Sequence, residues 1–135
     1  VRVHSQQIML AQEAALLSGD KTLLLEAEKV VEDALAKSPK RQQFLYTAAG
    51  IKIQLNKIPE AEALYKQAIA DDEKISESWW RLALLYSVSG QMDKAVKLIE
   101  EAQTKNISFD ADGQNIINEI LQKANFTETV LDTKK

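Results

Sequence analysis

Small residues recur in this chain at intervals of 34 residues, and this repeat constrains the fold more than any other feature. Ala27, Ala61 and Ala95 form one set, and the alanines at 34, 68 and 102 form a second set with the same interval. In each unit, small and large apolar residues are spaced 3, 4 and 3 apart, which makes one stripe along a helix. The sequence therefore predicts three helical units in which the alanines let neighbouring helices approach closely.

A second helical segment precedes each of the later alanine stripes. Residues 42–55 and 76–89 align at the same offset of 34. Each ends in a short polar break at Asn56 or Gly90, and both residue types tolerate the left-handed backbone that ends helices. The repeated unit is thus helix, tight turn, helix. The predicted repeats cover approximately residues 5–41, 42–75 and 76–109.

A further helix is predicted after the third repeat. Isoleucines at 116, 117 and 120 restore the helical stripe, and Asp110 or Asp112 stands where it would cap the helix start. The other positions are polar, as the outer face of a terminal repeat requires. We predict a capping helix over 111–125, a single domain over 1–125, and a flexible tail over 126–135, where no clear period continues.

Composition supports an all-α chain and narrows its partners. With only four Gly and two Pro among 135 residues, the sequence lacks the turns of an all-β protein. The net charge of -3 argues against sequence-blind binding to nucleic acid, which needs a basic surface. No apolar run approaches the roughly 18 residues of a membrane span, so we expect no membrane insertion. The absence of cysteine fits a soluble segment of either the cytoplasm or the periplasm.

Nothing in the sequence predicts catalysis. His4 is the one histidine, it stands near a terminus, and no triad or metal-ligand set surrounds it. The acidic run Asp71-Asp72-Glu73 lacks the spacing of a calcium loop, and no glycine-rich phosphate loop occurs. We therefore predict a protein that is not an enzyme and has no cofactor and no metal site.

The repeat pattern resembles the tetratricopeptide repeat family. The third unit carries the resemblance at Trp79, Leu82, Ala83, Tyr86, Gly90, Ala95, Ile99 and Ala102. The second unit departs at Lys52 and Asn56, where that family usually has Tyr and Gly. The resemblance implies an all-α, right-handed α-solenoid of three helix-turn-helix repeats plus the capping helix. It also implies a concave groove, lined by the first helix of each repeat, that binds a protein or peptide.

Two adjacent tryptophans make the groove prediction specific. Side chains of consecutive helical residues point about 100° apart, so Trp79 can face the core while Trp80 faces the groove, as would Tyr46 in the preceding repeat. The alternative is that Trp80 packs between repeats, with its indole N–H on a carbonyl. The groove candidates are Gln43, Tyr46, Thr47, Ile53, Gln54, Glu77, Trp80, Arg81, Leu84 and Ser87.

One class of ligand is disfavoured. Some members of the family bind acidic chaperone C-termini through Lys, Asn and Arg side chains, but only Arg81 occupies a matching place here. Arg81 also has Glu77 four residues earlier on the same helix, and we expect a local ion pair rather than ligand capture. Glu77 would further repel an acidic peptide.

The preferred function is therefore a non-catalytic scaffold that binds a protein or peptide in the groove. The stretches SPKRQQFLYTAAG and ESWWRLALLYSVSGQ also resemble the C-terminal repeats of bacterial O-antigen polymerase or ligase-like membrane proteins. That resemblance implies an accessory domain of a larger envelope-glycan protein. The alternative is a structural spacer that forms homo-oligomers, because exposed aromatic residues serve either purpose.

Overall fold

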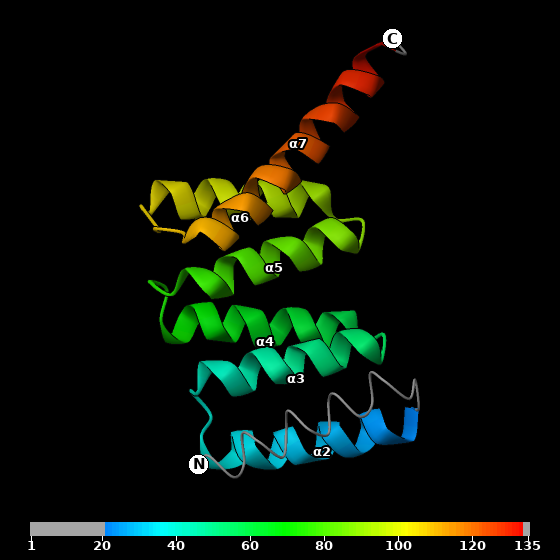
Figure 1. Cartoon of the computed structure of the whole chain (residues 1–135), viewed down its shortest axis with the longest axis vertical. Coiled ribbons are helices and arrows are strands. Elements are labelled where there is room, and N and C mark those ends of the chain that lie inside the picture. Colours follow the sequence, from blue (N-terminus) through cyan, green and yellow to red (C-terminus); the bar gives the residue numbers. More distant parts are fainter. Residues whose placement is uncertain (1–20, 134–135) are drawn as a thin grey trace. The chain divides into compact units, whose positions relative to one another are not determined.

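The computed structural model describes residues 21–133, which form six α-helices without a strand in this range (Figure 1). The helices are α2 (Lys21–Lys37), α3 (Gln42–Gln54), α4 (Ile58–Asp71), α5 (Ser76–Val88), α6 (Met92–Thr104) and α7 (Ala111–Thr133). The predicted fold class, an all-α helical repeat, is confirmed. The chain divides between Asp71 and Asp72 into two units, and each is described by itself.

In the first unit, α3 packs against both α2 and α4. The alanines of the predicted stripe, at 27, 34, 61 and 68, are at most 1% exposed. Phe44, Ala48 and Ile51 of α3 join the stripe of α2 in one apolar cluster. The small side chains thus lie where two helices come closest, and larger ones fill the space beside them.

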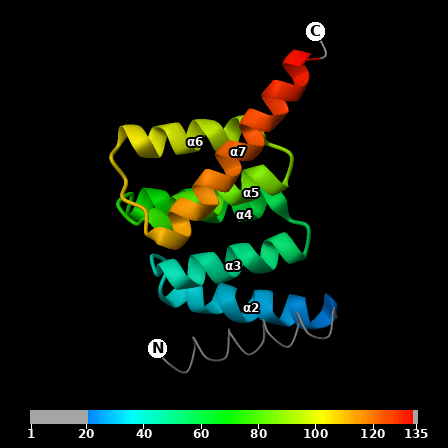
Figure 2. The same ribbon diagram turned by 45° about the horizontal axis from the view of Figure 1, so that its top comes forward.

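In the second unit, α5 packs against α6 and α7, and α6 also contacts α7. Trp79 is 2% exposed, and its indole Nε1 donates a hydrogen bond of 2.7 Å to the carbonyl oxygen of Glu73. The predicted core role of Trp79 is confirmed. Ile117 and Ile120 of α7 complete this core. Figure 2 shows the C-terminal half of α7 extending beyond α5 and α6.

Three helices end in the same tight turn. Asn56, Gly90 and Asn106 have φ angles of 60°, 77° and 58°, the left-handed region. In each case the next amide donates to a carbonyl five residues back, with N···O distances of 2.7, 2.8 and 3.0 Å. This is the hydrogen bond of a Schellman motif, which satisfies carbonyls at a helix end. The turns predicted at Asn56 and Gly90 are confirmed.

The capping helix is longer than predicted. It begins where expected, because Asp110 Oδ1 accepts a 2.7 Å hydrogen bond from the amide of Gly113 and so caps the helix. It continues to Thr133, where a flexible tail was predicted from residue 126. The segment contains no proline, and Gly113 in the first turn is its one glycine, so nothing in it stops the helix. The first helix of the first repeat and His4 lie outside the described residues.

Candidate functional site

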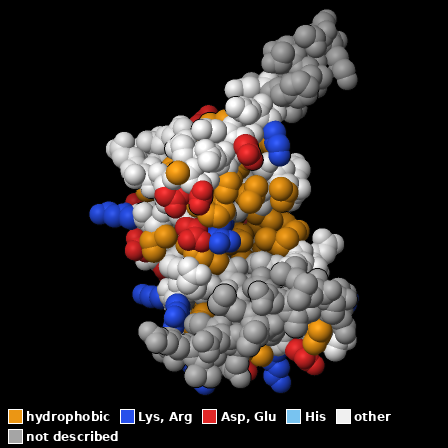
Figure 3. All heavy atoms as spheres, viewed as in Figure 1, with side chains coloured by type: hydrophobic (Ala, Val, Ile, Leu, Met, Phe, Trp, Pro, Cys, Tyr) orange, Lys and Arg blue, Asp and Glu red, His pale blue; other side chains and the backbone are white. Residues whose placement is uncertain are grey.

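The outward face of α5 carries an apolar stripe. The helix buries Trp79, Leu82 and Tyr86 on one side, which leaves Trp80, Leu84 and Val88 on the other. These three are spaced by four residues and therefore lie in a row. Leu84 is 37% exposed and Val88 is 68% exposed, although both are large and apolar. Figure 3 shows hydrophobic side chains gathered over α5 on this face.

Trp80 is half-buried at one end of the stripe, because the start of α7 lies against its ring. A Cβ atom added to Gly113 would stand 2.7 Å from Trp80 Cδ1 and 3.2 Å from Trp80 Nε1. Only a residue without a side chain fits beside this edge of the indole. The alternative prediction of helix packing therefore describes part of the ring, and its packing partner is the capping helix α7.

Arg81 and Glu77 form the local ion pair that the sequence favoured. Arg81 Nη2 and Nε each lie 2.7 Å from Glu77 Oε2, four residues earlier on α5. The guanidinium carbon also lies 4.9 Å from the centroid of the Trp80 ring, a cation–π distance. The positive charge of Arg81 is thereby largely neutralised at the edge of the apolar stripe.

The corresponding face of α3 is different, and here one prediction is wrong. Tyr46 was expected to line the groove, but it is only 5% exposed. Its hydroxyl donates a 3.0 Å hydrogen bond to Gln42 Oε1, and its ring centroid lies 6.4 Å from that of Tyr65, so neighbouring side chains enclose it. Gly50 and Gln54 stand where α5 has Leu84 and Val88, so α3 has no apolar stripe.

The remaining candidates are placed as follows. Gln43 and Gln54 are exposed, whereas Thr47, Ile53 and Ser87 are half-buried. The candidates on α3 and those on α5 belong to different units, and a groove shared by both helices stays a prediction. Sequence reasoning missed Val88, which its position four residues after Leu84 would have indicated, and it missed Gly113, which no periodicity marks.

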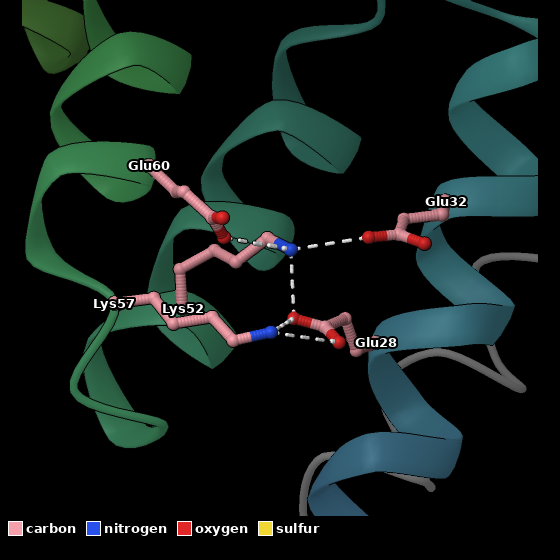
Figure 4. A network of polar contacts seen from close by, with 5 residues as sticks. All are labelled: Glu28, Glu32, Lys52, Lys57 and Glu60. Atoms are coloured by element: carbon pink, nitrogen blue, oxygen red, sulfur yellow. Dashed lines mark hydrogen bonds and ion pairs between the residues drawn. The ribbon is translucent and has the colours of Figure 1, made fainter.

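A polar network on the first unit was also missed (Figure 4). Lys52 of α3 extends its Nζ toward carboxylate oxygens of Glu28, Glu32 and Glu60 at 2.7, 3.1 and 3.2 Å. Lys57 Nζ lies 3.0 Å from Glu28 as well. The side chains of Lys52 and Glu28 are each 12% exposed, so α2, α3 and the start of α4 share one largely buried group of charges.

The network shifts the pKa values of its two buried members. Burial alone would lower the pKa of the Lys52 ammonium, but hydrogen bonds to its three carboxylate partners raise it well above its usual range. Burial alone would likewise raise the pKa of the Glu28 carboxyl, but hydrogen bonds from Lys52 and Lys57 hold it below its ordinary value. Both groups are therefore charged at neutral pH, and each stabilises the charge of the other.

Two further searches covered the described residues alone. Within 21–133, histidine, aspartate and glutamate side chains nowhere gather in a set of three or more suited to a metal ion. None of the helices in the same range combines the length and apolar composition that a bilayer crossing requires.

The helix pairs, the alanine stripes and the shared turns define an all-α helical repeat protein. The family model for the tetratricopeptide repeat matches residues 24–83, from α2 into α5. The match supports the tetratricopeptide repeat domain that the sequence pattern predicted. No curated protein sequence matches the chain.

Solved structures support the same fold. The translocator chaperone SycD of the Yersinia enterocolitica type III secretion system is 15% identical, with a TM-score of 0.69 over 95% of this chain and 85% of its own. The TPR2B domain in the pHsp70 complex of yeast Sti1 is 17% identical, with a TM-score of 0.63 over 90% and 98%. The first TPR of RPAP3, bound to the HSP90 peptide SRMEEVD, is 17% identical, with a TM-score of 0.58 over 90% and 95%. At these identities the likeness shows the fold alone.

Proposed function

We propose that this chain is a non-catalytic scaffold that binds a segment of another protein on the outward face of α5. The stripe of Trp80, Leu84 and Val88 carries the proposal, because its last two members are 37% and 68% exposed. Apolar side chains that gather on a surface mark interaction sites, and aromatic and arginine residues are enriched where binding energy concentrates. Similar folds in complex with peptides, such as the pHsp70 complex of Sti1, support a binding role.

The chemistry of this face favours an apolar partner over an acidic one. A peptide such as SRMEEVD, which RPAP3 binds, would meet a guanidinium on α5 that already bonds Glu77 at 2.7 Å. It would also meet the carboxylate of Glu77 itself, which repels it. We therefore propose a partner whose apolar side chains recur one helical turn apart, because that spacing matches the stripe on α5.

A displayed library of short random peptides, selected against the chain, tests the partner class. Enriched peptides are then titrated into ¹⁵N-labelled protein while the two indole N–H signals are followed by NMR. We expect enrichment of apolar residues three and four apart and a large shift of the Trp80 signal. The Trp79 signal should move less, because its N–H is bonded to Glu73 inside the core.

Val88→Lys places a charge in the stripe, and Leu25→Lys is its matched control, because Leu25 is an exposed apolar residue of α2. Binding to V88K should weaken at least about tenfold, since the loss of one buried apolar contact and a charge at the interface exceeds about 1.4 kcal/mol. Binding to L25K should be unchanged. Equal affinity of both variants would show that α5 is not the binding face.

Self-association through the same face is the competing function. Sedimentation velocity over a range of protein concentrations separates the two. A constant monomer mass supports a foreign partner, whereas an increase in mass that V88K abolishes would replace that partner with a second copy of the chain.

The cellular setting is a separate part of the proposal, an accessory domain of a bacterial envelope-glycan protein. Its support is the resemblance of SPKRQQFLYTAAG and ESWWRLALLYSVSGQ to the repeats appended to O-antigen polymerase or ligase-like proteins. The coding sequence upstream of Val1 tests it. Several apolar stretches of about 20 residues would support the setting, and a start codon close to Val1 would contradict it.

A further inference from the structure

The first unit has a hollow on a surface that is distinct from the face of α5. A shallow pocket of about 280 Å³ lies among α2, α3 and α4. Its apolar lining comes from Leu35 of α2, Ala48 of α3, and Ala63 and Leu64 of α4, with Glu32 and Glu60 beside them. All of these residues belong to one unit, so the pocket depends on a single set of packed helices.

The pocket follows from the lysine at position 52, which is another of its lining residues. In the next repeat the equivalent residue is Tyr86, whose ring fills its surroundings and is 4% exposed. Lys52 is unbranched, and its ammonium is held by Glu28, Glu32 and Glu60 at 2.7–3.2 Å. A linear side chain occupies less lateral space than a ring, which leaves apolar wall uncovered beside it.

The charges around the pocket are unbalanced. Three carboxylates, on Glu28, Glu32 and Glu60, face two ammonium groups, on Lys52 and Lys57. The outer two carboxylates, Glu32 and Glu60, are 56% exposed and line the pocket. Each retains oxygen lone pairs toward solvent, since a carboxylate accepts more hydrogen bonds than the one that Lys52 supplies.

We propose that this pocket binds a partner-protein segment in which one large apolar side chain, Phe or Leu, stands between Arg or Lys residues. The apolar side chain covers Ala48, Ala63 and Leu64, and the flanking cations pair with Glu32 and Glu60. The occupant is positively charged because the five-residue network carries one more carboxylate than ammonium groups. This surface is separate from α5, and the two binding activities are therefore independently testable.

The probe is the blocked peptide Gly-Arg-Phe-Arg-Gly, titrated into the ¹⁵N-labelled chain. We expect saturable NMR shifts at the amides of Ala48, Ala63 and Leu64. Gly-Arg-Ala-Arg-Gly removes the apolar group and should bind at least about tenfold more weakly. Gly-Glu-Phe-Glu-Gly reverses the charges and should give no saturable shifts at these amides. Equal binding of all three peptides, or no shifts with the first, overturns the proposal.

Two pairs of variants locate the site. Ala63→Leu fills the pocket from an exposed position on α4, and Ala70→Leu adds the same bulk to an exposed position outside it. A63L should weaken binding at least about fivefold while A70L leaves it unchanged, since only the first covers the apolar wall. Binding by A63L equal to that of A70L overturns the assignment.

For the charges, the double variant Glu32→Gln with Glu60→Gln is compared with Glu26→Gln with Asp33→Asn. Both remove two exposed carboxylates, but only the first pair lines the pocket. The first should weaken binding by about two- to fivefold per exposed ion pair, and the second by less. Equal weakening would mean attraction by net charge alone and overturns the specific pairing. Thermal melts accompany each variant to establish that the chain is folded.

Discussion

The repeats α3–α4 and α5–α6 share a backbone plan but place opposite chemistry at one equivalent position. Lys52 of α3 lies in a group of five charged side chains. Tyr86, 34 residues later on α5, is 4% exposed, and the ammonium of Lys94 lies 5.7 Å from the centroid of its ring. The residue 34 before Lys94 is Glu60, so the partner has changed sign together with the position that it contacts.

The outward faces of these repeats differ in the same way. On α5 the row of Trp80, Leu84 and Val88 is apolar, whereas the equivalent row on α3 is Tyr46, Gly50 and Gln54. Small residues and left-handed turns therefore set the common backbone, and the residues between them give each repeat its own surface. The binding properties of one repeat cannot be transferred to the next from the shared pattern.

The largest expected effect comes from the exchange of Lys52 for the tyrosine of the next repeat. Lys52→Tyr should lower the free energy of unfolding by about 2–3 kcal/mol, because largely buried Glu28 loses its closest partner. Adding Glu60→Lys, which recreates the Tyr–Lys pair of α5 and α6, should recover about 1 kcal/mol. Urea denaturation of the two variants measures both values.

Tyr86→Lys is the reciprocal control. It places a lysine beside Lys94 and should destabilise the chain more than K52Y does, because two like charges then meet at a position that is only 4% exposed. If K52Y were as stable as the unmodified chain, the charged network would contribute nothing, and the difference between the repeats would be superficial.

A smaller effect is expected where α7 meets Trp80. Gly113→Ala should lower the free energy of unfolding by about 1–2 kcal/mol, since the new methyl would stand 2.7 Å from Trp80 Cδ1 and the two helices must shift apart. The Trp fluorescence maximum should move to longer wavelength as water reaches the ring. Urea denaturation and emission spectra measure the two outcomes.

Trp80→Ala supplies the control, because it removes the ring that Gly113 accommodates. In that background G113A should be neutral or stabilising by up to about 1 kcal/mol, as expected for Gly to Ala in a helix. The same cost in both backgrounds would mean that the glycine serves the Asp110 cap rather than the contact with Trp80, since the added methyl would also stand 3.1 Å from Asp110 Oδ1.

The smallest effect depends on pH and separates a charged network from an apolar contact. The pKa of Glu28 is lowered from 4.5 in the folded state, so its stabilising effect is complete above pH 4.5 and is lost as the pH falls through the folded value. Glu28→Gln should cost about 1 kcal/mol at pH 7, and the difference from the unmodified chain should shrink in acid. Urea denaturation from pH 7 to about pH 3 measures this trend.

At the alkaline end the sign is opposite. The pKa of Lys52 is raised above 10.5, so its contribution is complete below pH 10.5 and is lost as the pH rises through the folded value. A pH-independent difference between E28Q and the unmodified chain would mean that Glu28 acts by packing and not by charge.

The sequence predicted those parts of the structure that depend on local spacing. The alanine stripes, the core position of Trp79 and the turns at Asn56 and Gly90 follow from helical period and backbone preference. The ion pair of Arg81 with Glu77 is equally local, because its partners are four residues apart. These features need no knowledge of how helices pack against one another.

Features that depend on contacts between helices were not predictable in this way. Lys52 was visible as a departure from the family pattern, but its partner Glu28 lies 24 residues away on another helix. Tyr46 was assigned to a groove by its helical angle, yet Tyr65 of α4 helps to enclose it. Gly113 fits beside Trp80 from a helix whose length the apolar period did not reveal.

The unlike residues at 52 and 86 also bear on how the chain finds its fold. A sequence with the same stripe every 34 residues offers each helix several nearly equivalent neighbours, and repeat proteins are prone to mispairing for that reason. If α2 met α5 in place of α3, Glu28 would face a tyrosine ring instead of the ammonium of Lys52. The charged network thus serves as an address that distinguishes the correct neighbour of α2 from an imitation one repeat further along.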